Sequence, residues 1–483
     1  WSRIVVIVMH YEHETTVHAP RQTVWDWHTR EGAFDRLTPP WEPMETVSAP
    51  PDLRPGGRRV IRFPLLGPIK GRWIAEHTDL VEGELFADRM VRGPFKRWWH
   101  THRFVDKGEM TIIEDEVSYD VPMGFLGRLF GGRMVRKRIL QMFTAREKGL
   151  INDITRQMEF ADAPRKRVLV VGGSGLIGSN LIPFLDCMGH EVTQLVRREP
   201  SHPRHRFWDP SNGVLDIEHL EGIDAVIHLG GVGIGDKRWT KKRKAAIIGS
   251  RRDSVTLLAE KMASMDSPPE VFIVASAIGY YGNRGDEEVD ESSKRGEGFL
   301  SETTEMWEAS ADAARDASIR TIHLRTGIVM SPLGGALGHM LLPFKLGGGG
   351  PIGNGKQWFS WISMNDHIAA IQHLMMTPEC EGPFNLTSPN PVRQKQFARV
   401  LGRVLRRPAF APLPGFVLRI VFGELARPLL LEGQKVLPKR LLQSGFEFRN
   451  PDLEESLRDV LGAWKIDNKP LQSSSTAQTS TQV

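Results

Sequence analysis

The hydrophobic pattern of the chain changes near residue 167. Beyond this point, continuous apolar runs alternate with helical stretches, as buried parallel strands and their covering helices require. The apolar runs lie at residues 168–171, 191–196, 224–229, 270–275 and 321–325. This alternation predicts an α/β Rossmann fold, a doubly wound parallel sheet, over residues 167–328.

Residues 1–160 follow a different pattern. Short strands are expected at residues 58–63, 71–77 and 111–121. After them, apolar side chains from Val135 to Met158 recur at three- and four-residue steps, which is typical of an amphipathic helix packed on a sheet. The pattern predicts an N-terminal α+β domain of the helix-grip type.

The remaining segments are assigned from their composition. The polar, proline-containing residues 161–166 are predicted to be a linker. Residues 329–463 begin rich in glycine and proline and then become helical, which predicts a small, α-rich C-terminal substrate domain. Residues 464–483 end in a tract rich in Ser, Thr and Gln, and a disordered tail is expected there.

Composition excludes several classes of protein. The length of 483 residues suits about three domains, and 63 basic against 58 acidic residues leave too small an excess to favour a nucleic-acid partner. No apolar run approaches the roughly 20 residues of a membrane span. The two cysteines, Cys187 and Cys380, are far apart and lack metal-ligand spacing, so we expect no structural metal and a reducing, cytoplasmic location.

A glycine-rich motif follows the first strand of the Rossmann pattern and precedes a helical stretch at residues 179–188. Glycines in this order allow a tight turn, a close approach to a pyrophosphate and close packing of the helix on the strand. The motif consists of Gly172, Gly173, Ser174, Gly175, Leu176, Ile177 and Gly178. Together with Val196, Leu229, Gly230 and Ala275 near the ends of later strands, it predicts a dinucleotide site.

Charge at the end of the second strand indicates which dinucleotide binds. Arg197 and Arg198 stand where an NAD enzyme usually has an acidic residue for the ribose 2′-hydroxyl. A guanidinium there attracts a 2′-phosphate, so we predict NADP as cofactor with Arg197 as the ligand. Arg251 is a second candidate for the phosphates, the alternative being an exposed helix arginine.

Further motifs identify a family. They are Asp236-Lys-Arg-Trp239, Ser276-Ala-Ile-Gly-Tyr-Tyr-Gly282, Leu324-Arg-Thr-Gly327, Gly347-Gly-Gly-Gly-Pro-Ile-Gly-Asn-Gly355, Trp361-Ile362 and Gly433-Gln-Lys-Val-Leu-Pro438. With the glycine motif, they make residues 167–463 resemble the atypical extended short-chain dehydrogenase/reductases, specifically the NAD-dependent-epimerase-like family. The resemblance implies an oxidoreductase or epimerase-like protein with a small-molecule carbonyl or sugar-like substrate. It places Gln357 and Lys345 near that substrate, whereas Asp366 is expected to cap the following helix.

The N-terminal part resembles the START-related, polyketide-cyclase-like domains. The resemblance rests on His28, Arg36-Leu-Thr-Pro-Pro-Trp41 and Trp98-Trp-His-Thr-His-Arg-Phe104, and it implies a bound hydrophobic ligand. In a strand, Trp98, His100, His102 and Phe104 share one face. The two histidines could bind a metal or a polar ligand head, but satisfied strand histidines are the preferred interpretation.

The catalytic chemistry is not the standard one. Short-chain dehydrogenases use a tyrosine whose pKa is lowered by a lysine four residues later. The residues four positions after the four tyrosines are Thr15, Met123, Arg284 and Gly285, so no such pair exists. The resemblance places Leu300 and Thr304 at the Tyr and Lys positions. Ser276, Tyr280 and Tyr281 are the alternative catalytic candidates.

Two hypotheses therefore stay open. The first is an NADP-dependent oxidoreductase or epimerase-like enzyme with a fused ligand domain. The second is a non-catalytic module that senses NADP(H) and binds a ligand. The sequence leaves the oligomeric state undetermined.

Overall fold

The computed structural model describes residues 9–66, 69–121 and 124–464. Its contacts divide the chain into two units. Unit 1 comprises Trp1–Thr29, Glu42–Glu147 and Ala463–Val483, and unit 2 comprises Arg30–Trp41 and Lys148–Gly462. The domain boundaries given above stay predictions, and nearly all of the expected tail lies outside the described residues.

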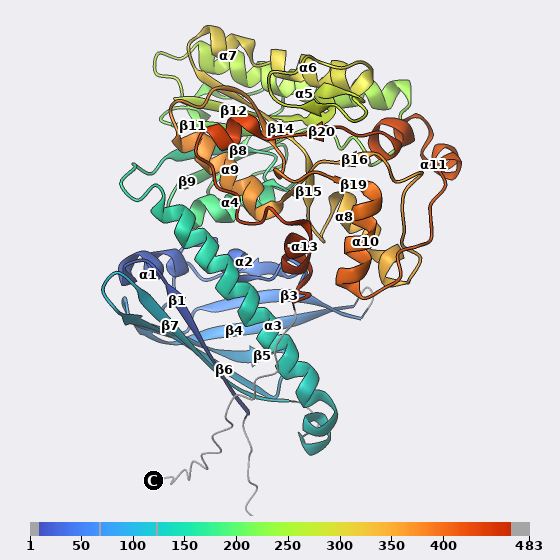
Figure 1. Cartoon of the computed structure of the whole chain (residues 1–483). Coiled ribbons are helices and arrows are strands. Elements are labelled where there is room, and N and C mark those ends of the chain that lie inside the picture. Colours follow the sequence, from blue (N-terminus) through green and yellow to red (C-terminus); the bar gives the residue numbers. More distant parts are fainter. Residues whose placement is uncertain (1–8, 67–68, 122–123, 465–483) are drawn as a thin grey trace, which may run out of the picture. The chain divides into compact units, whose positions relative to one another are not determined.

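Unit 1 is built on an antiparallel sheet of seven strands in the order β1-β7-β6-β5-β4-β3-β2 (Figure 1). The strands are β1 (Met9–Val17), β2 (Glu45–Ser48), β3 (Arg58–Leu66), β4 (Ile69–Val81), β5 (Leu85–Arg92), β6 (Arg97–Asp106) and β7 (Thr111–Asp120). The helices of the N-terminal part are α1 (Arg21–Thr29), α2 (Ala33–Leu37), which belongs to unit 2, and α3 (Gly124–Met158), which continues into unit 2.

The core of unit 1 lies between one face of this sheet and α3. Alternate residues of β6, from Trp98 to Phe104, are buried, as the period of a strand requires. Ile139 and Phe143 of α3 pack against Trp98 and the neighbouring strands. The predicted α+β layer structure is confirmed.

Unit 2 contains a parallel sheet of seven strands in the order β10-β9-β8-β11-β12-β14-β18. The strands are β8 (Arg167–Val171), β9 (Glu191–Val196), β10 (His205–Phe207), β11 (Ala225–His228), β12 (Val271–Ala277), β14 (Arg320–Thr326) and β18 (Gly382–Leu386). The order reverses direction beside β8, so ligands bind at the carboxyl ends of the strands around that point. The predicted Rossmann fold is confirmed.

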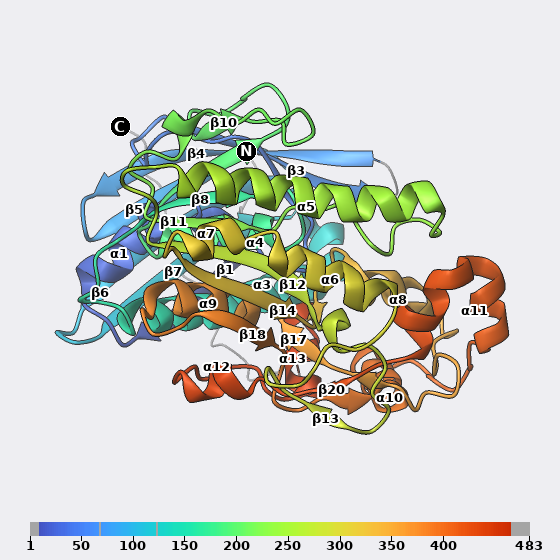
Figure 2. The same cartoon turned by 90° about the horizontal axis from the view of Figure 1, so that it is seen from above.

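Two layers of helices cover this sheet (Figures 1 and 2). One layer contains α4 (Gly178–Cys187) and α9 (Met364–Met376), and the other contains α5 (Lys241–Ala263), α6 (Phe299–Ala309) and α7 (Asp312–Asp316). Leu169 and Val171 pack toward α5 with its Leu258, whereas Val168 and Val170 are buried on the opposite face. Burial on both faces explains the unbroken apolar runs of the sequence.

The C-terminal part of unit 2 is mostly helical. Its helices are α8 (Gly335–Lys345), α10 (Gln394–Leu405), α11 (Gly415–Phe422), α12 (Lys439–Gln443) and α13 (Leu453–Leu461). The short strands of this part are β15 (Ile328–Met330), β16 (Trp358–Phe359), β17 (Trp361–Ser363), β19 (Val392–Arg393) and β20 (Lys435–Val436), and β20 pairs with β13 (Glu288–Val289), which precedes α6. Among the described helices, none combines the length and the apolar character needed to span a bilayer.

Asp366 does not cap α9, which corrects the prediction. The cap is Ser363, whose hydroxyl accepts a hydrogen bond from the Asp366 backbone N–H at 2.9 Å. The buried Asp366 carboxylate instead accepts backbone hydrogen bonds from Arg449 and Asn450 at 2.9 and 3.0 Å. The helix begins two residues earlier than expected, and its aspartate joins a distant loop to the helix.

Candidate dinucleotide site and the adjoining polar network

The glycine motif forms a tight turn between β8 and α4. Gly172 has a φ of +85°, which disfavours any residue with a Cβ. A Cβ on Gly178 would lie 2.4 Å from the Gly172 carbonyl oxygen. The turn therefore requires glycine at both positions. It opens on the first turn of α4, whose unpaired N–H groups suit a phosphate.

The other motif residues surround this turn. Ser174 and Gly175 are exposed, and Leu176 and Ile177 are half-buried. A Cβ on Gly334 would lie 3.5 Å from Leu176 Cδ1. The segment that precedes α8 therefore packs beside the glycine turn, as expected for a segment that reaches over a ligand.

Neighbouring strand ends complete the edge of the site. Leu229 and Gly230 follow β11, and a Cβ on Gly172 would lie 2.9 Å from the Gly230 nitrogen. Val196 is the last residue of β9, and Ala275 is half-buried in β12. The structure thus brings the predicted cofactor residues to the carboxyl edge of the sheet.

Arg197 lies directly after β9. The parallel register pairs Val171, the last residue of β8, with Leu195, so Arg197 follows the end of β9 at the same edge of the sheet at which the glycine turn leaves β8. Both Arg197 and its neighbour Arg198 are exposed, and within the described part of the chain Arg197 has no hydrogen-bond or ion-pair partner. An unpaired guanidinium beside the turn is available to a ligand phosphate.

Arg251 is buried rather than exposed on its helix. Its guanidinium donates hydrogen bonds to the carbonyl oxygens of Val232 and Ile247, each at 3.0 Å, and lies 4.6 Å from the centre of the Trp307 ring. Burial lowers the pKa of Arg251 to about 10. Arg251 holds the loop that follows β11, and its contact with phosphates stays a prediction.

The catalytic candidate Ser276 belongs to a buried polar network. Its hydroxyl donates to Glu308 Oε1 at 2.7 Å. Arg325 donates two hydrogen bonds to the same carboxylate, from Nε to Oε1 and from Nη2 to Oε2, both at 2.9 Å. Although burial opposes it, Arg325 holds the pKa of Glu308 below its usual value. The carboxylate is therefore ionised and fixes the Ser276 hydroxyl.

Tyr281 is the other end of this network. Its hydroxyl donates to Asn385 Oδ1 at 2.7 Å and accepts from Arg325 Nη1 at 3.1 Å. The side chain is 0% exposed, and burial raises its pKa to about 12. This direction is opposite to the lowered pKa of a dehydrogenase tyrosine.

Tyr280 lies against the same guanidinium. The Arg325 Cζ atom is 3.5 Å from the centre of the Tyr280 ring, a cation–π contact. Arg284, by contrast, pairs with Glu287 at 2.7 Å. The cation beside the two tyrosines is therefore Arg325. The sequence did not indicate that Arg325 and Glu308 bind the catalytic candidates, although Arg325 lies within one of the family motifs.

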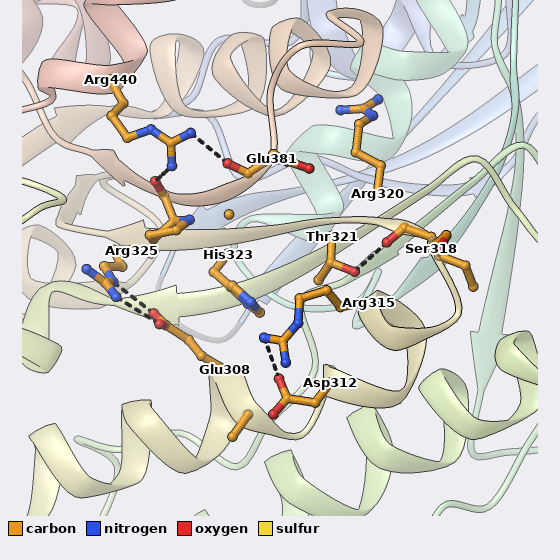
Figure 3. A pocket seen from close by; sticks show the side chains of 14 residues that line it. Glu308, Asp312, Arg315, Ser318, Arg320, Thr321, His323, Arg325, Glu381 and Arg440 are labelled. Atoms are coloured by element: carbon orange, nitrogen blue, oxygen red, sulfur yellow. Dashed lines mark hydrogen bonds and ion pairs between the residues drawn. The ribbon is translucent and has the colours of Figure 1, made fainter.

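A groove of about 930 Å³ runs beside this network, along β14 and β18 (Figure 3). Glu308, His323 and Arg325 line one part of it. The guanidinium of Arg320 is occupied by three backbone carbonyl oxygens, and that of Arg440 by two. The arginines Arg320 and Arg440 that line the groove therefore already have hydrogen-bond partners, and no sequence motif indicated this groove.

The two predicted substrate residues differ in their environment. Gln357 Nε2 donates to the carbonyl oxygens of Ile352 and Leu430 at 3.0 and 2.7 Å, whereas its buried Oε1 has no hydrogen-bond partner among the described residues. Lys345 is the exposed last residue of α8. Gln357 therefore joins two loops. Within the described residues, its side chain makes no contact with the side chain of Lys345.

Comparison with known proteins agrees with this architecture. The model of the NAD dependent epimerase/dehydratase family matches residues 168–387, that of polyketide cyclase / dehydrase and lipid transport matches residues 17–143, and a domain of unknown function, DUF1731, matches residues 413–460. An epimerase family protein of Mycobacterium bovis is 39% identical over 290 residues, 60% of this chain and 96% of that protein. Human epimerase family protein SDR39U1 is 39% identical over 298 residues, 61% of this chain and 99% of that protein.

Two solved structures extend the comparison. A crystal structure described as the nucleoside-diphosphate sugar epimerase from Corynebacterium glutamicum is 32% identical with a TM-score of 0.77, and the match covers 94% of this chain and 90% of that one. Human SDR39U1 (isoform 2) with NADPH is 36% identical with a TM-score of 0.57, over 61% of this chain and 99% of that one. The chain therefore belongs to the NAD dependent epimerase/dehydratase family, as a nicotinamide-dinucleotide-binding member with a polyketide-cyclase-like N-terminal domain.

Proposed function

We propose that this protein binds NADP(H) in preference to NAD(H). The observation that carries the proposal is the exposed, unpartnered Arg197 beside the glycine turn. A 2′-phosphate adjacent to this guanidinium gains a charge-assisted hydrogen bond that a 2′-hydroxyl lacks. The human relative solved with NADPH supports the same choice.

The residues that would hold the cofactor are those of the turn and the strand ends. Gly172 to Gly178 would receive the pyrophosphate, Arg197 the 2′-phosphate, and Val196, Leu229, Gly230 and Ala275 the remaining surface. When bound, the nicotinamide supplies a hydride donor or acceptor. Arg251 supports this site by holding the loop after β11.

We further propose an oxidoreductase or epimerase-like reaction on a carbonyl or sugar-like small molecule. The similarity to a protein described as a nucleoside-diphosphate sugar epimerase supports this class of substrate. In this chain Ser276 is oriented by Glu308, so its oxygen keeps lone pairs that can accept a hydrogen bond. Tyr280, half-buried against Arg325, is the remaining tyrosine with a surface for a ligand.

A second candidate function is NADP(H) sensing without turnover. It is favoured by Tyr281, whose hydroxyl is fully buried, doubly hydrogen-bonded and raised in pKa to about 12. A tyrosine in that state does not exchange a proton with substrate at neutral pH. In both candidates the N-terminal domain would bind a hydrophobic ligand, as the name of its family suggests. A cytoplasmic location stays part of the proposal.

One experiment separates the two candidates. The full chain is loaded with stoichiometric NADPH and mixed with a panel of aldehydes, ketones and nucleotide sugars, and loss of NADPH fluorescence is followed. An oxidoreductase gives at least a single turnover with one member of the panel. Retention of intact NADPH with every member, together with no epimerised nucleotide sugar after incubation with the NADP⁺-loaded chain, supports the sensor in protein shown to bind the cofactor. Failure to bind NADPH overturns both.

A further inference from the structure

The inner face of the sheet of unit 1 carries titratable side chains at its centre. The register pairs His77 of β4 with Asp88 of β5, and Asp88 with His100 of β6. In the adjacent row, His102 of β6 pairs with Asp115 of β7. A face that should serve only an apolar ligand would not bury these groups, because burying a polar group is costly unless it gains a partner.

Asp115 fixes the two β6 histidines. Its Oδ1 accepts hydrogen bonds from His100 Nε2 at 3.0 Å and from His102 Nδ1 at 2.6 Å. A carboxylate offers lone pairs and no hydrogen, so Asp115 accepts both hydrogen bonds. Each ring therefore carries its proton on the nitrogen that faces Asp115. The free lone pairs are on His100 Nδ1 and His102 Nε2.

A carboxylate that orients a histidine in this way is the usual outer partner of a metal ligand. One ligand atom from each of Asp88, His100 and His102 lies within 4.8 Å of the other two. His100 Nδ1, a nitrogen with a free lone pair, is 3.9 Å from Asp88 Oδ2. In a tetrahedral site with bonds of about 2.0 Å the ligand atoms stand roughly 3.3 Å apart, so modest side-chain rotations are sufficient.

The Asp88 carboxylate and the His77 ring lack partners of their own. Both ring nitrogens of His77 are buried without a hydrogen bond in the described part of the chain. Asp88 makes no hydrogen bond there either, and its one ion-pair contact is the 3.9 Å approach to His100. The buried unsatisfied nitrogens of His77 need an explanation, whereas the Asp88 side chain is 18% exposed and its carboxylate is available to a cation.

We propose that Asp88, His100 and His102 form a mononuclear site for a divalent transition-metal ion, with a fourth position open to water or to His77, the register partner of Asp88. Two imidazoles and a carboxylate suit Zn²⁺ and neighbouring first-row ions rather than Ca²⁺ or Mg²⁺, which prefer oxygen. This proposal replaces the sequence-based expectation that the chain binds no metal. It does not depend on the dinucleotide site, which lies in unit 2.

The test uses the full-length chain after treatment with a chelator. Co²⁺ is added and visible absorption is recorded, and Zn²⁺ is then titrated by calorimetry. We expect one equivalent of Co²⁺ to give the intense visible bands of a four-coordinate ion, one equivalent of Zn²⁺ to remove them, and Zn²⁺ to raise the thermal unfolding midpoint. No binding at one equivalent would overturn the proposal.

Variants show which residues are responsible. Asp88→Asn and His102→Gln should each weaken Zn²⁺ binding at least about tenfold, whereas His18→Ala, an exposed histidine just after β1, should leave it unchanged. Asp88→Asn keeps the hydrogen bonds of Asp115, so its metal-free unfolding midpoint should match that of the metal-free wild type. Equal Zn²⁺ affinity in the wild type and in folded Asp88→Asn would contradict the assignment.

Discussion

Arg325 donates a hydrogen bond to the hydroxyl of Tyr281 at 3.1 Å. The same guanidinium holds both carboxylate oxygens of Glu308, which in turn accepts from Ser276. One cation thus connects two of the three catalytic candidates and contacts the ring of the third, Tyr280. The network holds the three candidates in fixed positions through hydrogen bonds and a ring contact.

Removal of this cation should destabilise the protein strongly. The side chains of Arg325 and Glu308 are 4% and 13% exposed, so Arg325→Gln leaves a buried carboxylate without its partner. Such a loss costs about 3–5 kcal/mol. The measurement is the midpoint of urea unfolding, followed by circular dichroism.

Arg284→Gln is the matched control for that variant. It removes an arginine from an exposed ion pair with Glu287, and exposed pairs contribute little to stability. Its unfolding midpoint should stay close to that of the wild type. Equal midpoint shifts in the two variants would show that the pair of Arg325 and Glu308 contributes no more to the stability of the fold than a surface ion pair does.

The ionisation of Tyr281 provides a pH test. Its folded-state pKa of about 12 lies above the ordinary value of 10, so the folded state holds this proton more tightly than the unfolded state. The resulting stabilisation is complete below pH 10 and is lost as the pH rises toward 12. Up to pH 10, absorbance at the tyrosinate band should therefore be the same in the wild type and in Tyr281→Phe. A tyrosinate step at or below pH 10 that disappears in this variant would contradict the buried environment.

The glycine turn should not tolerate a side chain at residue 178. In Gly178→Ala the new Cβ would stand 2.4 Å from the Gly172 carbonyl oxygen, so the turn has to open. We expect NADPH binding, measured by fluorescence titration, to weaken at least about tenfold because the phosphate-binding backbone is displaced. Gly235→Ala is the control, since its Cβ meets nothing within 4 Å. Unimpaired binding by a folded Gly178→Ala protein would argue against phosphate binding at this turn.

The parts of the fold that depend on local pattern were predictable. The strand expected at residues 191–196 is β9, Glu191–Val196, because a buried parallel strand must be apolar along its whole length. The helix expected at residues 179–188 is α4, Gly178–Cys187, because the last glycine of the motif marks its start. The glycine turn was predictable for the same reason, since its residues are consecutive in the chain.

Contacts between elements were not predictable. Glu308 and Arg325 meet because α6 packs on β12, the strand beside β14, and nothing in the sequence near either residue indicates a partner. The shared face of His100 and His102 follows from the period of β6, whereas Asp88 and Asp115 enter that face through the strand register. Register depends on turn geometry and on the hydrophobic pattern of both paired strands, so the pattern of one strand alone does not reveal it.

The most direct test of the account is the ratio of the dissociation constants for NADH and NADPH, measured by fluorescence titration in the wild type, Arg197→Ala and Arg198→Ala. We predict that the wild type binds NADPH more tightly by at least about tenfold, as the loss of one charge-assisted hydrogen bond to a phosphate implies. Arg197→Ala should bring the ratio close to one by weakening NADPH alone, whereas the adjacent exposed Arg198→Ala should keep most of the preference. An unchanged ratio in Arg197→Ala, or a wild type without preference, would contradict the proposed 2′-phosphate site.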